Sequence, residues 1–188
     1  MFKVGIDEYS LTVHRGPLPL VYGDYRKNAS LADEIDLNSP EGEVCFVSAG
    51  LANRWPSLVV AQRFSPSEAG FSPGVLLVPE TEVLFIGAGV RLLAYSLDGP
   101  ARLWEDSTDA GFWCWNRHGG FVLMSGELEL AAWDLRGRKL WSRDVEPPWT
   151  YEVENGLVDI RIEGFKPIFF PIASGPPSIG QGGGSARG

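Results

Sequence analysis

Glycines in the stretch VLFIGAG, residues 83–89, could form a turn that binds the phosphates of a nucleotide. A dinucleotide-binding turn has the pattern Gly-x-Gly-x-x-Gly, because the third glycine lets the following helix pack closely against the strand. That third position is Leu92 here, and the residues that follow, VRLLAYSLDG, end in a turn signal typical of strands. The pattern therefore predicts a tight turn between two strands and no cofactor.

Other residues have the types needed for catalysis or metal binding but lack the spacing. Cys114 and His118 lie four residues apart on one strand face, but a zinc site needs three or four ligands. Acyl transfer needs a serine on a sharp strand-to-helix elbow, whereas Ser48 and Ser125 lie in strand-to-turn positions of the repeat. Carboxylate pairs such as Glu127 and Glu129 are frequent, and a glycoside hydrolase needs one pair, yet these two alternate as on a solvated strand edge. We assign no catalytic residue and no metal ligand from the sequence.

Aromatic residues are the best candidates for a binding surface. In FWCWNRH, residues 112–118, alternation predicts that Trp113, Trp115 and Arg117 share one strand face. Trp and Arg are enriched at interaction hot spots, and the two prolines of EPPWTYE stiffen a loop that presents Trp149. The same rings could instead fill the sheet core, and the sequence leaves this alternative open. The predicted binding residues are Trp113, Trp115, Arg117, His118, Trp149 and Tyr151.

Composition and charge narrow the classes of partner. The 188 residues are 44% hydrophobic, which is enough to bury a core in one domain. The formal net charge of −8, with no cluster of Lys or Arg, disfavours nucleic-acid binding and would attract a basic partner. No apolar stretch reaches the ~18 residues of a membrane span, and the first residues do not have the pattern of a secretory signal. Cys45 and Cys114 form no CxxC motif and are expected as free thiols, although a pair between them stays open. These observations predict a cytoplasmic protein.

Most of the chain has the pattern of a β protein. Residues 1–43 mix short apolar pieces with polar loops, and we expect an irregular or strand segment packed on the main domain, with SLADEIDL as a short helix capped by Ser30. Residues 44–172 alternate apolar runs of roughly four to eight residues with Gly and Pro turns, which predicts an all-β, antiparallel domain. Residues 173–188 are rich in Gly and Ser and are predicted to be a disordered tail.

An internal repeat organises this β domain. Val83 and Val122, 39 residues apart, open matching runs: AYSLDGPARLW corresponds to AAWDLRGRKLW. A fainter copy begins at Val44, and a truncated one, LVDIRIEG, spans residues 157–164. Self-similarity near 40 residues with several strands per unit is typical of propeller blades.

The two clear units resemble the repeat of quinoprotein-type (PQQ) and WD40-type β-propellers. In the quinoprotein-type blades, a strand that ends in an Ala-Leu-Asp-like stretch turns through glycine into a strand that ends in Trp. The resemblance covers roughly residues 83–144 and implies a fold of propeller-like repeated sheets, either a partial propeller or a sandwich-like assembly, but no activity. Closed propellers have about four to eight blades, so two clear and two faint units imply an open assembly.

Three classes of function are compatible with these patterns. The favoured class is a non-catalytic protein-binding module, a class that includes bacterial immunity and accessory proteins that bind a basic partner. The second is a carbohydrate-binding protein or glycoside-active enzyme, with Trp platforms beside a carboxylate pair. The third is a structural subunit that completes a propeller as a homo-oligomer.

Overall fold

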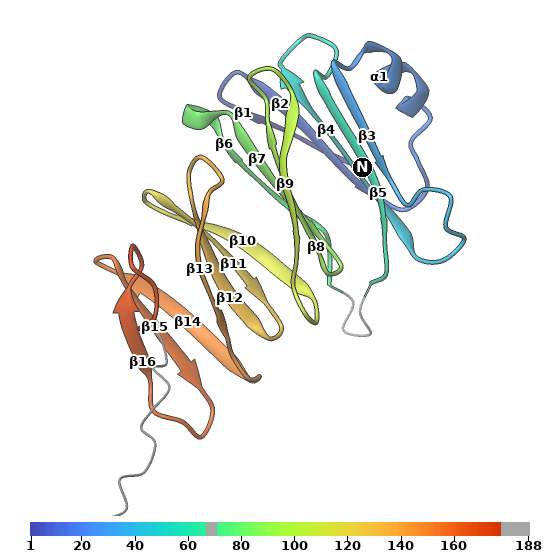
Figure 1. Ribbon diagram of the computed structural model, residues 1–188. Coiled ribbons are helices and arrows are strands. Elements are labelled where there is room, and N and C mark those ends of the chain that lie inside the picture. The colour runs from blue at the N-terminus through green and yellow to red at the C-terminus, as the bar shows by residue number, and fades with distance from the viewer. Residues whose placement is uncertain (67–70, 178–188) are drawn as a thin grey trace, which may run out of the picture.

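The computed structural model describes residues 1–66 and 71–177. Its strands form four sheets that stack face to face in a row, from the first sheet at the upper right of Figure 1 to the last at the lower left. The predicted all-β fold of repeated, mainly antiparallel sheets is confirmed, and none of the sheets closes into a barrel. No helix in these two ranges has the length and apolar character needed to cross a membrane.

The elements of each sheet follow one another in space as follows. The first sheet contains β1 (Phe2–Ile6), β2 (Tyr9–Arg15), β4 (Glu43–Leu51), β5 (Leu58–Phe64) and β3 (Leu31–Ile35). The second contains β6 (Gly74–Val78), β7 (Val83–Ala88), β8 (Arg91–Ser96) and β9 (Ala101–Ser107). The third contains β10 (Phe112–His118), β11 (Phe121–Gly126), β12 (Glu129–Asp134) and β13 (Lys139–Asp144), and the fourth β14 (Trp149–Glu154), β15 (Leu157–Ile162) and β16 (Ile168–Pro171). Helix α1 spans Tyr22–Asn28, and a 3-10 turn spans Pro79–Thr81.

The central strands are apolar on both faces because each inner sheet lies between two others. Every residue of β7 is buried, and a strand buried on both sides has a continuous apolar sequence rather than an alternating one. Leu84 and Ile86 belong to the core shared with the first sheet, whereas Phe85 belongs to the core shared with the third. A third core, which contains Leu123 and Ile160, joins the third and fourth sheets.

In the last three sheets, the repeat in the sequence corresponds to a repeat in the structure. Val83 opens β7, Val122 lies in β11 and Leu157 opens β15, and each of these strands is second in its sheet. The indole N–H of Trp104 donates to the Gly137 carbonyl oxygen of the next sheet at 2.5 Å, and the indole N–H of Trp141 donates in the same way to Ile172 at 2.7 Å. The turn after β7 joins two antiparallel strands, as predicted, and not a strand to a helix as in a dinucleotide-binding turn.

The faint copy at Val44–Gly50 is not a further unit of this kind. Tyr9, which pairs with the last residue of β4, donates a hydroxyl hydrogen bond to Glu82, immediately before β7. Arg15, which pairs near the start of β4, lies 3.5 Å from the Ser72 hydroxyl, beside the end of β7. β4 therefore runs opposite to β7. The similarity between the two segments reflects burial on both faces, which imposes the same apolar composition.

The helix expected at SLADEIDL is also wrong, because residues 31–35 form the strand β3. β3 pairs in parallel with β5, and Leu31 and Ile35 pack against the core between the first two sheets. Asp33 on the same face accepts hydrogen bonds from the next sheet, so tertiary contacts outweigh the local helical signal. The helix lies earlier, at Tyr22–Asn28, and residues 1–43 supply three of the five strands of the first sheet.

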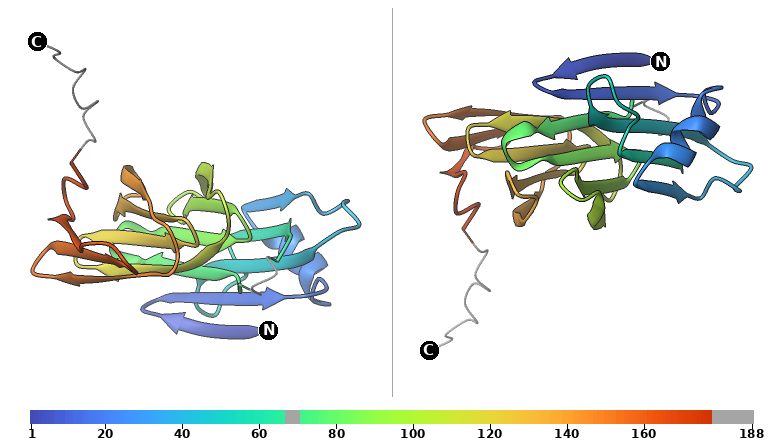
Figure 2. Two further views of the ribbon diagram at one scale, coloured as in Figure 1. Left: turned by 90° about the horizontal axis from the view of Figure 1, so that it is seen from below. Right: turned by 90° about the horizontal axis from the view of Figure 1, so that it is seen from above.

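The outer faces of the first and fourth sheets differ from the faces of the two inner sheets. Tyr22 and Tyr25 of α1 pack on Phe46, so the helix covers part of the outer face of the first sheet (Figure 2). At the opposite end β14 and β15 alternate buried and polar residues, and the polar face carries the ion pair of Arg161 with Asp159 at 2.7 Å. A polar outer face is typical of a terminal unit in a stacked array.

Two prolines lie along the edge of β16 that faces away from β15. The Ile172 N–H donates to the Gly156 carbonyl oxygen at 2.9 Å, and β16 is antiparallel to β15, so the N–H groups of alternate residues point toward β15. Residues 167, 169 and 171 then face the free edge, and two of the three are proline, without an N–H to donate. Such an edge resists pairing with another strand.

We expect the double variant P167T/P171T to self-associate, because it restores two edge donors beside the exposed Phe169. Light scattering after size exclusion should show dimers or larger species of the variant at concentrations where the natural chain is monomeric. Equal masses for the two proteins would contradict the assignment of this edge.

Gly87 is required by the approach of the third sheet. A Cβ atom at Gly87 would lie 2.5 Å from ring atoms of Phe112, so no larger residue fits without displacing that ring. We expect G87A to lower the free energy of unfolding by about 1–3 kcal/mol. Urea denaturation would measure the loss, and G87A/F112L should recover part of it. G23A is the control: Gly23 belongs to α1, a Cβ atom there would meet nothing within 4 Å, and the change should be neutral or stabilising.

Candidate functional site

A β-bulge changes the predicted aromatic face. The register shifts between Phe112 and Cys114, which breaks the alternation expected for this strand. Trp115 packs against Phe85 of the second sheet, with 5.2 Å between ring centroids. Trp113 stacks on Trp149 of the fourth sheet at 5.4 Å, with 17° between the ring planes. The two tryptophans therefore face different neighbouring sheets and do not form one outer surface.

The predicted binding residues mainly join sheets to one another. Trp115 and Trp149 are 8% and 6% exposed, and the Trp149 indole N–H donates to the Glu127 carbonyl oxygen at 2.9 Å. Arg117 is exposed but forms an ion pair with Glu80 of the second sheet. Trp113, His118 and Tyr151 are half-buried in the interface between the third and fourth sheets.

A short row of polar side chains crosses the same interface. The Asn116 amide donates to the Tyr151 hydroxyl at 2.9 Å and to Cys114 Sγ at 3.2 Å, and Cys114 Sγ lies 3.0 Å from the Ser125 hydroxyl. The His118 ring meets the Tyr151 ring edge-on, and its buried Nε2 has no hydrogen-bond partner among the residues that the structure describes. Burial lowers the pKa of His118 and raises the pKa of Tyr151 to about 12. Burial in this interface therefore favours the neutral forms of His118 and Tyr151.

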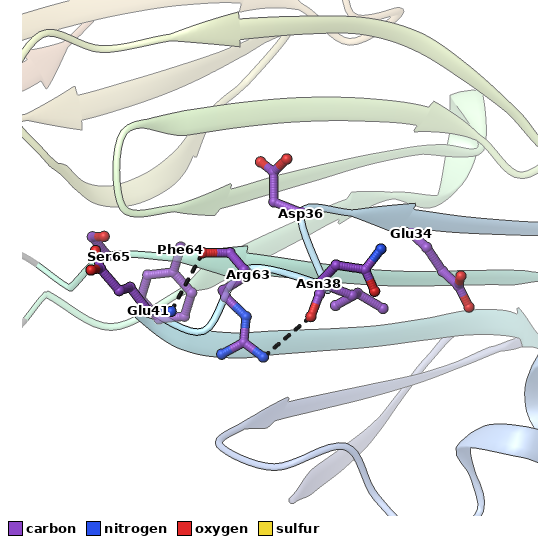
Figure 3. Close-up of a pocket in the computed structure, with 9 residues that line it drawn as sticks. Glu34, Asp36, Asn38, Glu41, Arg63, Phe64 and Ser65 are labelled. Atoms are coloured by element: carbon purple, nitrogen blue, oxygen red, sulfur yellow. Dashed lines mark hydrogen bonds between the residues drawn. The ribbon is translucent and has the colours of Figure 1, made fainter.

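Open hollows lie instead where β5 and β7 end. Two adjoining hollows, of about 650 and 540 Å³, share the rim residues Arg63, Phe64 and Ser65. Figure 3 shows the first hollow, where Arg63, near the end of β5, donates a hydrogen bond to the loop that follows β3. We call the pair the acidic hollows, because five carboxylates line them together with Arg63 and Arg91: Glu34, Asp36, Glu41, Glu105 and Asp106.

Close backbone contacts hold the walls of the acidic hollows. Gly42 has a φ of +84°, and a Cβ atom there would clash with the Phe64 carbonyl oxygen, so only glycine lets the loop before β4 approach β5. The Arg63 guanidinium donates to the carbonyl oxygens of Gly42 at 3.0 Å and Leu37 at 3.4 Å. These contacts fix the carboxylate-bearing loop against the sheet.

Ion pairs connect the two hollows across the first and second sheets. Arg91 binds Asp36 at 2.6 Å and Glu105 at 3.0 Å, and Arg102 binds both oxygens of Asp33 at 2.8 Å. The Asp36 and Glu105 side chains nevertheless keep 59% and 42% of their surface exposed. Glu41 has no ion pair within the two described ranges. Glu34 pairs with Arg26 and Asp106 pairs with Lys139, both at 2.8 Å. The more exposed Asp36, Glu41 and Glu105 are therefore the carboxylates accessible to a cationic side chain from another molecule.

A carboxylate pair does converge elsewhere, as the carbohydrate alternative requires. Asp106 and Glu129 both approach the Lys139 ammonium, at 2.8 and 3.7 Å, and burial raises the pKa of Glu129. Asp106 lines the second hollow, but Glu129 is not among the residues that line it. Trp113 and Trp149 stack on one another and cover part of the ring faces that a sugar would need.

The sequence indicated Glu34, Glu105 and Asp106 only as members of carboxylate pairs, and none of the residues of the acidic hollows was predicted as a binding residue. Their signal is the loop DEIDLNSPEGE, residues 33–43, in which carboxylates alternate with turn formers. Its contact with Arg63 and Arg91 depends on the parallel strand β3, which the sequence indicated as a helix. The free thiols expected at Cys45 and Cys114 are observed, and burial raises the pKa of Cys45 to about 12.

Comparisons with known proteins give weak likenesses only. No family model and no curated protein matches the chain. Among solved structures, a computationally designed protein, Ika4, is similar over 59% of this chain and 72% of its own, with 11% identity and a TM-score of 0.42. KlHsv2 with loop 6CD replaced by a Gly-Ser linker is similar over 55% of this chain and 36% of its own, with 12% identity and a TM-score of 0.31. Likenesses of this size carry no argument about function.

The Tyr151 phenol should make the fold sensitive to alkaline pH. Its pKa rises from 10.0 to about 12 on folding, so its stabilising contribution is complete below pH 10 and is lost as the pH rises from 10 toward 12. We expect the unfolding free energy of Y151F to fall less steeply over this range than that of the natural chain. Urea denaturation at several pH values would measure both slopes, and equal slopes would contradict the prediction.

Proposed function

We propose that this chain is a non-catalytic protein-binding module whose acidic hollows receive a segment of a basic partner protein. The observation that carries the proposal is that five carboxylates surround two adjoining hollows of a size that admits Lys or Arg side chains. Two arginines, Arg63 and Arg91, line the same walls, and three further cationic side chains pair with carboxylates of the set: Arg26 with Glu34, Arg102 with Glu105 and Lys139 with Asp106. Arg63 is occupied by backbone carbonyl oxygens, and Arg91 by Asp36 and Glu105.

The arrangement suits recognition of a cation more than catalysis. Exposed carboxylates interact weakly one by one, but a group of them on a chain with a net charge of −8 raises the association rate with a basic partner. The walls stand on paired strands and on the close contact at Gly42, so little ordering is needed when a partner binds. Salt should weaken such binding, because it screens the exposed charges.

Two finer features of the chain belong to the same proposal. The last three sheets share one strand order, and the second and third sheets each make a matching Trp contact with the sheet that follows, which supports a kinship with quinoprotein-type or WD40-type propeller blades. The free thiols of Cys45 and Cys114 suit a reducing compartment and support a cytoplasmic location. Neither feature depends on the identity of the partner.

The proposal can be tested with a simple basic probe. We expect an acetylated and amidated tetralysine peptide to bind at low salt, and NMR shifts to gather at residues that line the acidic hollows. The double variant D36N/E41Q should weaken this binding about fivefold or more, because it removes two accessible carboxylates from the first hollow.

A matched control separates a local site from general charge attraction. The variant E152Q/E154Q makes the same change in net charge on the outer side of the fourth sheet. It should leave tetralysine binding within about twofold of the natural chain. Equal weakening by both variants, or shifts spread over the whole surface, would refute the proposal.

A further inference from the structure

The outer face of the first sheet carries a second, oppositely charged site. α1 covers β4 and β5 but leaves β1 and β2 open, as the right-hand view in Figure 2 shows. A small hollow of about 30 Å³ lies on this open part. Cations and hydroxyls line it, and none of its lining residues is a carboxylate: Lys3, Ser10, Thr12, Tyr25, Ser48, Gly50, Leu51, Arg54 and Pro56.

The polar groups stand side by side because of the strand register. Lys3 pairs with Thr12, and Thr12 pairs with Ser48, so an ammonium and two hydroxyls form one row across β1, β2 and β4. Thr12 and Ser48 are only 4% and 3% exposed, yet both line the hollow. A hydroxyl that lines a hollow beside the cationic residues Lys3 and Arg54 can donate a hydrogen bond to a ligand with acceptor oxygens.

An exposed tryptophan, Trp55, borders the hollow. Six of the seven tryptophans are buried or half-buried, whereas Trp55 is 55% exposed. Its neighbours in the loop between β4 and β5, Arg54 and Pro56, line the hollow, and its ring meets Tyr25 edge-on at 5.9 Å. Leu51, which is 37% exposed, accepts a hydrogen bond from the Arg54 backbone N–H.

Backbone contacts hold the loop that carries Trp55. The Ala52 N–H donates to the Glu8 carbonyl oxygen at 2.8 Å, which ties the loop to the β1–β2 turn. A Cβ atom at Gly50 would lie 2.7 Å from the backbone nitrogen of Ser57, so glycine allows the loop to fold tightly against the strand. The backbone that carries Trp55 is therefore held in place, which lowers the ordering cost when a ligand binds.

We propose that this hollow and Trp55 bind the C-terminal carboxylate of a peptide whose last residue is apolar. The carboxylate accepts hydrogen bonds from the Thr12 and Ser48 hydroxyls and lies between the charges of Lys3 and Arg54, which have no ion pair in the described part of the chain. The volume is close to that of two water-sized oxygens, so the hollow takes a carboxylate and little more. The apolar side chain, attached one carbon away, rests on Trp55.

This site is independent of the acidic hollows. It has the opposite charge, lies on a different part of the first sheet and shares none of the residues that line them. A chain with both sites could hold a partner by a basic segment and by its terminus. Each site can fail in its own test without affecting the other, and D36N/E41Q should leave carboxylate binding unchanged.

Three short peptides distinguish the source of the carboxylate. Acetyl-Gly-Leu-Phe with a free terminus should bind at least about tenfold more tightly than the same peptide with a terminal amide. Acetyl-Asp-Leu-Phe amide, whose carboxylate is on a side chain, should bind no better than the amide. The measurement is a titration followed by NMR, with shifts expected at the Trp55 indole and at the Thr12 and Ser48 amides.

Variants of the protein complete the test. K3Q, R54Q and T12V should each weaken binding of the free-acid peptide, whereas K27Q, on α1 outside the hollow, should not. T12V keeps the side-chain shape, and its amide spectrum would report any loss of fold. Equal binding of the acid and the amide, tighter binding of the aspartate peptide, or shifts away from Trp55 would each overturn the proposal.

Discussion

A sheet that is apolar on both faces needs a neighbour on each side, and this requirement shapes the whole molecule. Strands such as β7 have no polar face to present to water, so the second and third sheets are stable only as inner layers. The layers at each end must then differ from the inner ones. Helix α1 covers part of one end, and a charged strand face closes the other.

The sequence predicted the fold class because burial and turns leave strong local signals. The 39-residue spacing between Val83 and Val122 reports strands in equivalent positions, and the Trp of each unit makes an equivalent contact with the next sheet. The direction of a strand leaves no such signal. The apolar run that begins at Val44 therefore matched β7 although the two strands run in opposite directions.

The site was less predictable, because it depends on contacts between distant segments. The bulge after Phe112 shifts Trp113 and Trp115 to different interfaces, and alternation alone could not indicate this shift. Trp55 follows an Arg and precedes a Pro, and Arg or Pro residues also lie near the tryptophans that were predicted to bind. The exposure of Trp55, however, depends on how the loop before β5 folds. Residue types indicated which side chains could bind, and tertiary structure decided which of them are accessible.

The stacking of sheets also has an evolutionary consequence. Each inner unit presents the same kind of face to the layer before it and to the layer after it, so a gene duplication of 39 residues between the second and third sheets would insert a layer that finds matching surfaces. The outer faces of the first and last sheets would stay the same after such a duplication. The protein could lengthen without acquiring a new fold, and the distance between features at its two ends would grow by one layer at a time.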